Sequence, residues 1–128
     1  MTPPVFPTLD EVVELHRIQI DRFGGSHGLR DLALLQSALA QPEMSFGGDY
    51  VHGDLAAMAA AYLFHLAKNH PFVDGNKRVA VATALLFLAF NGVEIEFDEV
   101  ALGDLTLAAA AGVKGKDEAT EFFRQVVK

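Results

Sequence analysis

The chain has 128 residues, 51% of them hydrophobic, which is enough for one domain, residues 1–128, with a proper core. Its formal net charge of −7 argues against non-specific nucleic-acid binding, because such affinity requires Lys and Arg to neutralise phosphates. The absence of cysteine excludes disulfides and thiolate catalysis. The sequence shows no signal peptide, and its apolar runs are shorter than the roughly 20 residues that span a bilayer, so we expect a cytoplasmic protein without a membrane partner.

The first predicted element is a helix over residues 9–23. Thr8 and Glu11 have the spacing of a capping box at its start, and two glycines follow its end. Two histidines belong to this region, His16 in the helix and His27 in the glycine-rich loop after it. Neither has a partner at metal-ligand spacing, so we interpret both as surface or packing residues outside the site.

Two further helices are predicted over residues 32–40 and 55–69, each preceded by an aspartate that can cap it. Between them, residues 42–53 contain turn formers and aromatic residues without a helical period, which predicts a long loop. Such a loop is as readily a functional segment as a plain connector. His65 lies among apolar residues of the third helix, and we interpret it as a hydrogen-bonded core histidine.

The most informative stretch is residues 69–78, NHPFVDGNKR, which leads into a predicted helix. From Val79 to Phe90 that helix has a single polar side chain, and a helix without a polar face has to be buried, so we expect it to be the centre of the fold. Pro71 predicts that the preceding helix ends before His70, and Phe72 is the expected anchor of the loop in the core.

The polar residues of this stretch suit phosphate chemistry. Asp74, Gly75 and Asn76 predict a tight turn with Asn76 as the N-cap of the following helix. A helix N-terminus is a ready anion site, because its N–H groups and its dipole face the ligand. Lys77 and Arg78 oppose that dipole unless a bound phosphate reverses the sign of the interaction.

The C-terminal third predicts two more helices. Residues 93–97, VEIEF, alternate like a strand, but one short strand makes no sheet, so we expect an extended connector. Asp98 is the expected cap of a fifth helix to about Ala111, and Asp117 begins a last helix whose apolar face either closes the core or receives a partner helix. The prediction is an all-α fold of about six helices around a buried central helix.

The stretch HPFVDGNKR resembles the Fic/Doc motif HPFx(D/E)GN(G/K)R, and its Lys is similar to that of the Doc, or death-on-curing, branch. RFGGSHGLRD, LLFLAFNGVEI and LGDLTLAAAAG also look Doc-like, so the resemblance covers nearly the whole chain. It implies the compact Fic/Doc-like (Fido) helical fold, with His70 as general base and Asp74 as the ligand of Mg²⁺. It also implies an anion hole at residues 75–78 and target docking near Phe46 and Tyr50.

The Doc branch implies a toxin that transfers the γ-phosphate of ATP to a Ser or Thr hydroxyl of elongation factor Tu, blocks translation and is restrained in trans by an antitoxin. Fic-type protein adenylyltransferases, which transfer AMP, are the alternative within enzymes. Lys77 and Val81 favour phosphate transfer, because adenylyltransferases carry a small Gly and a second Arg at these positions. A non-catalytic phosphate-binding module is the alternative outside enzymes, but it would need neither a base at His70 nor a carboxylate at Asp74.

Overall fold

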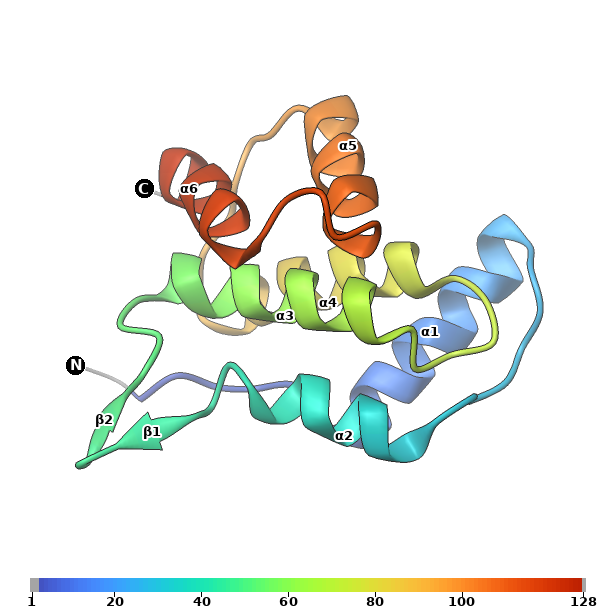
Figure 1. Cartoon of the computed structure of the whole chain (residues 1–128), viewed down its shortest axis with the longest axis horizontal. Coiled ribbons are helices and arrows are strands. Elements are labelled where there is room, and N and C mark those ends of the chain that lie inside the picture. The colour runs from blue at the N-terminus through green and yellow to red at the C-terminus, as the bar shows by residue number, and fades with distance from the viewer. Residues whose placement is uncertain (1–2, 128) are drawn as a thin grey trace.

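Six helices and one two-stranded hairpin make up residues 3–127, the part of the chain that the computed structural model describes (Figure 1). The elements are α1 (Leu9–Phe23), α2 (Leu32–Ala40), β1 (Ser45–Phe46), β2 (Asp49–Tyr50), α3 (Leu55–Asn69), α4 (Asn76–Phe90), α5 (Glu99–Ala110) and α6 (Lys116–Val126). The predicted all-α fold is therefore confirmed. No helix of this part is long and apolar enough to cross a membrane.

Helix α3 is the central helix of the fold. It contacts α2, α4, α5 and α6, and Figure 1 shows α2 on one side of it and the α5–α6 pair on the other. Its fully buried residues include Ala59, Ala60 and Ala61, whose small side chains let the neighbouring backbones approach closely. The expectation that α4 is the centre was wrong, because Val81 and Leu85 of α4 are only partly buried.

One cluster of buried side chains contains residues from all six helices, which favours the proposal of a single domain. The apolar face of α6 closes this core. Phe123 is fully buried, and Phe122 and Val126 pack against the cluster. Residues 93–97 form an extended connector without strand pairing, as predicted.

The helix ends follow local capping chemistry. The capping box of Thr8 and Glu11 is present, and Asp31, Asp54 and Asp98 each accept a backbone N–H of the helix that follows. The predicted start of α6 at Asp117 was one residue late. Gly115 occupies the cap position there and cannot supply a side chain, so the carboxylate of Glu118 accepts its N–H instead.

The loop predicted over residues 42–53 contains a short antiparallel hairpin. Ser45 pairs with Tyr50 and Phe46 with Asp49, around two glycines that have positive φ. Sequence periodicity cannot detect strands of two residues, which explains why the hairpin was missed. Phe46 is 85% exposed on this hairpin.

Several polar side-chain atoms on α3 and just before it are buried. His65 Nε2, Tyr62 Oη and His52 Nδ1 are buried without a hydrogen-bond partner in the described part of the chain, so the expectation of a hydrogen-bonded His65 was wrong. The pKa of His65 is lowered to about 4, mainly by burial and to a smaller extent by the nearby Lys116 and His52. Burial, assisted by Lys116, also lowers the pKa of His52.

We predict that the free energy of unfolding falls as the pH decreases through the range between the unfolded pKa of His65, 6.5, and its folded pKa, about 4. In this range the unfolded chain binds more protons than the folded chain. Because His65 is partly exposed, its contribution should be about 1–3 kcal/mol. Urea titrations across this range test the prediction. His65→Leu should flatten the pH dependence and His27→Leu, on the surface, should keep it; an unchanged slope in His65→Leu would contradict the prediction.

Candidate active site

The residues of the motif lie in the short loop between α3 and α4. Helix α3 ends at Asn69, as predicted, and His70 follows in the left-handed conformation, with φ 49° and ψ 55°. It is the one residue other than glycine with positive φ in the described chain. Arg30 holds this turn, because its Nε donates to the carbonyl of His70 at 2.7 Å and its Nη2 to that of Asn69 at 3.0 Å. The imidazole therefore starts from a fixed backbone position.

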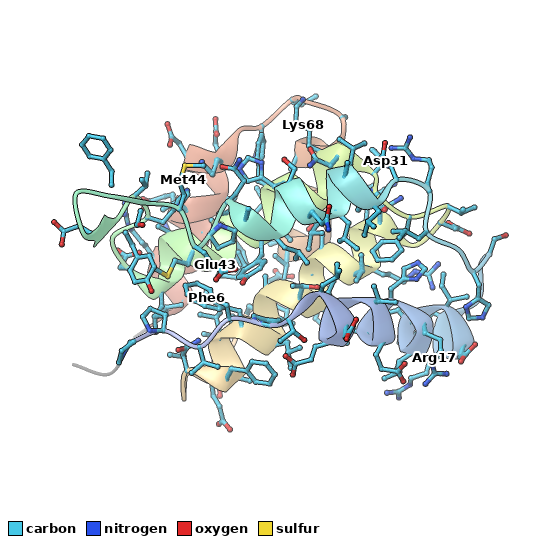
Figure 2. All side chains as sticks on the ribbon, turned by 90° about the horizontal axis from the view of Figure 1, so that it is seen from below. Phe6, Arg17, Asp31, Glu43, Met44 and Lys68 are labelled. Atoms are coloured by element: carbon cyan, nitrogen blue, oxygen red, sulfur yellow. The ribbon has the colours of Figure 1, made fainter. Side chains whose placement is uncertain are left out.

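The segment after α1 pairs with this loop. The N–H groups of Arg30 and Asp31 donate to the carbonyl of Pro71, and the N–H of Val73 donates to the carbonyl of Gly28. Figure 2, the view from below, shows Asp31 at the end of α2 that adjoins the motif loop. Phe72, at the centre of this pairing, is buried, which favours the prediction that it anchors the loop. The loop is thus held from two sides.

Asn76 does not cap α4, which corrects the sequence-based expectation. Its Oδ1 accepts the N–H of Phe72 at 2.9 Å and its Nδ2 donates to the carbonyl of Phe72 at 3.0 Å. The cap position belongs to Gly75, which has φ 74° and makes no side-chain cap. This positive φ favours glycine, and a Cβ at Gly75 would also lie 2.9 Å from Ile20 Cδ1, the end of a side chain that would have to shift. The first N–H groups of α4 remain available to an anion, including that of Asn76.

Asp74 presents its carboxylate beside this helix start. Its Oδ2 accepts the N–H of Ser26 at 3.1 Å and its Oδ1 that of Gly75 at 2.8 Å. These two bonds lower the pKa of Asp74, the Ser26 bond most, and Arg78 contributes less. A Cβ at Gly25 would lie 2.7 Å from Asp74 Oδ2, so glycine leaves room for the carboxylate. Asp74 is exposed and ionised at neutral pH.

The two cations of the motif differ in their surroundings. Arg78 Nη1 donates to the carbonyl of Gly24 at 2.9 Å, and its guanidinium lies 6.0 Å from the ring centre of Phe23. Arg78 is therefore turned toward the end of α1, although we expected it to hold phosphate. Lys77 is exposed and remains free to reach a ligand. Of the two side chains, that of Lys77 is better placed to donate a hydrogen bond to a bound phosphate.

An apolar groove of about 560 Å³ begins beside these cations. Val81 and Leu85 of α4 and Leu107 of α5 form its walls, and Arg22 and Lys77 are among its polar lining residues. The partly exposed side of α4 lines this groove and faces solvent there.

Phe46 and Tyr50 lie far from the motif loop. They belong to the hairpin at the start of α3, whereas the loop follows the end of that helix (Figure 1). A helix of 15 residues is roughly 22 Å long. The structure therefore does not bring these aromatic residues together with His70. Tyr50 also packs edge-on against Phe6, with ring centres 5.8 Å apart.

The two histidines interpreted as lying outside the site have different surroundings. His27 is exposed on the surface, where its Nε2 lies 2.9 Å from Asp21 Oδ1. His16 is buried under the motif loop, and its Nε2 lies 2.7 Å from the carbonyl oxygen of Asp74. Sequence reasoning missed this contact, because a single histidine in an amphipathic helix gives no sign of a partner distant in the chain.

Comparison with known proteins points to one family. Residues 6–88 match the family described as the Fic/DOC family. The chain is 38% identical over 103 residues to a protein named Protein kinase doc from Escherichia phage P1, an alignment that covers 80% of each chain. It is 46% identical over 76 residues to Toxin Doc from Mycolicibacterium smegmatis, which covers 59% of this chain and 58% of that protein.

We predict that Asn76→Ala lowers the free energy of unfolding by about 2–4 kcal/mol, because it leaves both backbone groups of the buried Phe72 without a partner. Asp31→Ala, which removes a true N-cap, is the matched control and should cost about 1 kcal/mol. Urea denaturation of both variants provides the measurement. A smaller loss in Asn76→Ala than in Asp31→Ala would contradict this account of Asn76.

Proposed function

The chain belongs to the Fic/DOC family, and from this premise we propose that it is a Doc-type toxin, an enzyme that transfers the γ-phosphate of ATP to a Ser or Thr hydroxyl of a protein. The observation that carries the proposal is the motif loop, which holds His70, the Asp74 carboxylate and the uncapped start of α4 within residues 70–76. Elongation factor Tu is the acceptor we propose, in the cytoplasm, so that its modification stops translation. The relatives named for a kinase and a toxin support this function.

The proposed reaction is a direct displacement. The oxygen of the acceptor hydroxyl attacks the γ-phosphorus of ATP, and its proton passes to the imidazole of His70. The bond between the γ-phosphorus and the oxygen that bridges it to the β-phosphate breaks, and ADP leaves. Lys77 and the first N–H groups of α4, with Gly75 allowing close approach, hold the phosphate oxygens during transfer.

Asp74 is the residue that we propose to hold Mg²⁺. The described residues contain no group of three or more metal-ligating side chains. A single exposed carboxylate nevertheless fits Mg²⁺, which binds one or two carboxylates and completes its shell with waters and phosphate oxygens. Each oxygen of Asp74 accepts one N–H and keeps further acceptor capacity. When bound, the metal neutralises phosphate charge.

AMP transfer is the runner-up function. It requires the α-phosphate to take the place that we give to the γ-phosphate. Lys77 occupies the position of the small Gly of adenylyltransferases, and Val81 that of their second Arg. Val81, which lines the apolar groove, has no charge with which to hold the terminal phosphates. These two residues favour γ-phosphate transfer.

We further propose that the groove between α1, α4 and α5 receives the antitoxin. Its apolar walls suit the apolar face of an amphipathic helix, and Arg22 and Lys77 at its rim suit acidic residues of that helix. A helix seated there would also cover Lys77, which we assign to phosphate binding. Occupation of the groove would then block the reaction without contact with His70.

The reaction type is tested with ATP labelled in the α or the γ position. We predict that γ-label reaches the acceptor protein and α-label does not, because Lys77 favours entry of the terminal phosphate. His70→Ala should abolish transfer while changing the free energy of unfolding by no more than about 1 kcal/mol, because its ring has no core packing role. His27→Ala, at the surface, is the matched control and should transfer normally. Retention of α-label on the acceptor would falsify the kinase assignment.

The groove is tested by placing a charge in its wall. We predict that Leu107→Glu abolishes inhibition by the antitoxin and keeps phosphate transfer, because a carboxylate opposes both the apolar contact and an acidic partner. Val100→Glu, on the same helix but outside the groove, is the control and should remain inhibited. Transfer assays with and without the co-expressed antitoxin provide the measurement. Full inhibition of Leu107→Glu would rule out this groove as the antitoxin site.

A further inference from the structure

His16 of α1 contacts Phe72 and Asp74 of the motif loop and lies beneath Gly75, although it is no part of the motif. It is 3% exposed, and its ring stacks on that of Phe72 with centres 3.8 Å apart and planes at 7°. Its Nε2 lies 2.7 Å from the carbonyl oxygen of Asp74. A Cβ built at Gly75 would lie 3.5 Å from the same nitrogen. One side chain of α1 therefore packs beneath the turn that carries Asp74.

The partner of His16 decides which of its ring nitrogens carries the proton. A carbonyl oxygen can only accept, so His16 Nε2 is the donor toward Asp74. Stacking on Phe72 fixes the plane of the ring, and Phe72 is itself held by the side chain of Asn76. The donor is consequently fixed in both position and direction.

The turn above it needs such a contact. Gly75 has φ 74°, and glycine adopts positive and negative φ about equally well, so the chain itself gives the peptide between Asp74 and Gly75 little preference for one orientation. A flip of this peptide would turn the carbonyl of Asp74 away from α1. It would also remove the N–H of Gly75 from Asp74 Oδ1, where the bond is 2.8 Å. The orientation of the carboxylate thus depends on the orientation of this peptide.

We propose that His16 is a positioning residue, which fixes the peptide between Asp74 and Gly75 so that the Asp74 carboxylate and the first N–H groups of α4 meet Mg-ATP in one geometry. This inference rests on the proposed function, since it assigns Asp74 to the metal. The loop has a separate anchor at its other end, where Arg30 holds the carbonyls of Asn69 and His70. His16 accordingly acts on the end that binds Mg-ATP and Arg30 on the end that carries the base.

Two substitutions separate the hydrogen bond of His16 from its packing. His16→Phe keeps a ring to stack on Phe72 but has no donor, and His16→Gln can place an amide N–H near the position of Nε2. The readouts are the affinity for Mg-ATP by isothermal titration calorimetry and the hydrogen exchange of the Gly75 amide, whose N–H is bonded to Asp74 Oδ1. His27→Gln, on the surface of the following loop, is the control.

We expect His16→Phe to weaken Mg-ATP binding by roughly 10–100-fold, the usual effect of losing a contact that orients a metal ligand. Exchange of the Gly75 amide should rise in the same variant, because its bond to Asp74 Oδ1 is lost when the peptide turns. His16→Gln should restore most of the affinity, and His27→Gln should match the parent. Unfolding curves show whether each variant is folded. His16→Leu repeats the test without a donor if the larger Phe prevents folding.

The outcomes separate this inference from the proposed function. Equal Mg-ATP affinity in the parent and in His16→Phe would overturn the inference alone. Equal weakening in His16→Phe and His16→Gln would also overturn it, because the role would then be packing. A parent chain that binds Mg-ATP in a His16-dependent manner but transfers no phosphate would overturn the proposed function and support the positioning role.

Discussion

The antiparallel contact between residues 28–31 and residues 71–73 is the interaction on which the candidate site depends. A short loop between two packed helices has few partners of its own for its backbone N–H and C=O groups, and these groups need partners when buried. The segment after α1 supplies them at Pro71 and Val73. Phe72 is thereby held in the core while Asp74 stays at the surface. The site is therefore formed by tertiary contacts between two segments that are distant in the sequence.

Local rules predicted most of the helices, because their determinants lie within a few residues of each other. Thr8 with Glu11, and the aspartates at positions 31, 54 and 98, act as caps in the structure as they do in isolated helices. Asn76 is the exception. As a cap it would satisfy one N–H of α4 that solvent or an anion can also satisfy, whereas both buried backbone groups of Phe72 depend on it. Leaving the two backbone groups of Phe72 buried without partners would cost more free energy than leaving one N–H of α4 uncapped, so the side chain of Asn76 turns toward Phe72.

The motif residues could be found from sequence, but the residues that support them could not. Order and spacing point to His70 and Asp74, since their chemistry is local to one loop. His16 and Arg30 support the same loop from α1 and from the segment after it, and nothing in the residue types around them in the sequence indicates these distant contacts. The difference follows from what each residue contacts: a reacting group has to face the ligand, and a supporting group has to face another part of the chain.

Helix α4 was expected to be fully buried because it has almost no polar side chain, yet it leaves Val81 and Leu85 at the wall of an open groove. The physical rule behind the expectation still holds, since an apolar helix face in water is unfavourable wherever it occurs. Helices α1 and α5 flank this face without covering it. We infer that the face is completed by the helix of a partner. On this inference the apolar composition of α4 suits its complex with the partner, whereas in the free chain the same face lines an open groove.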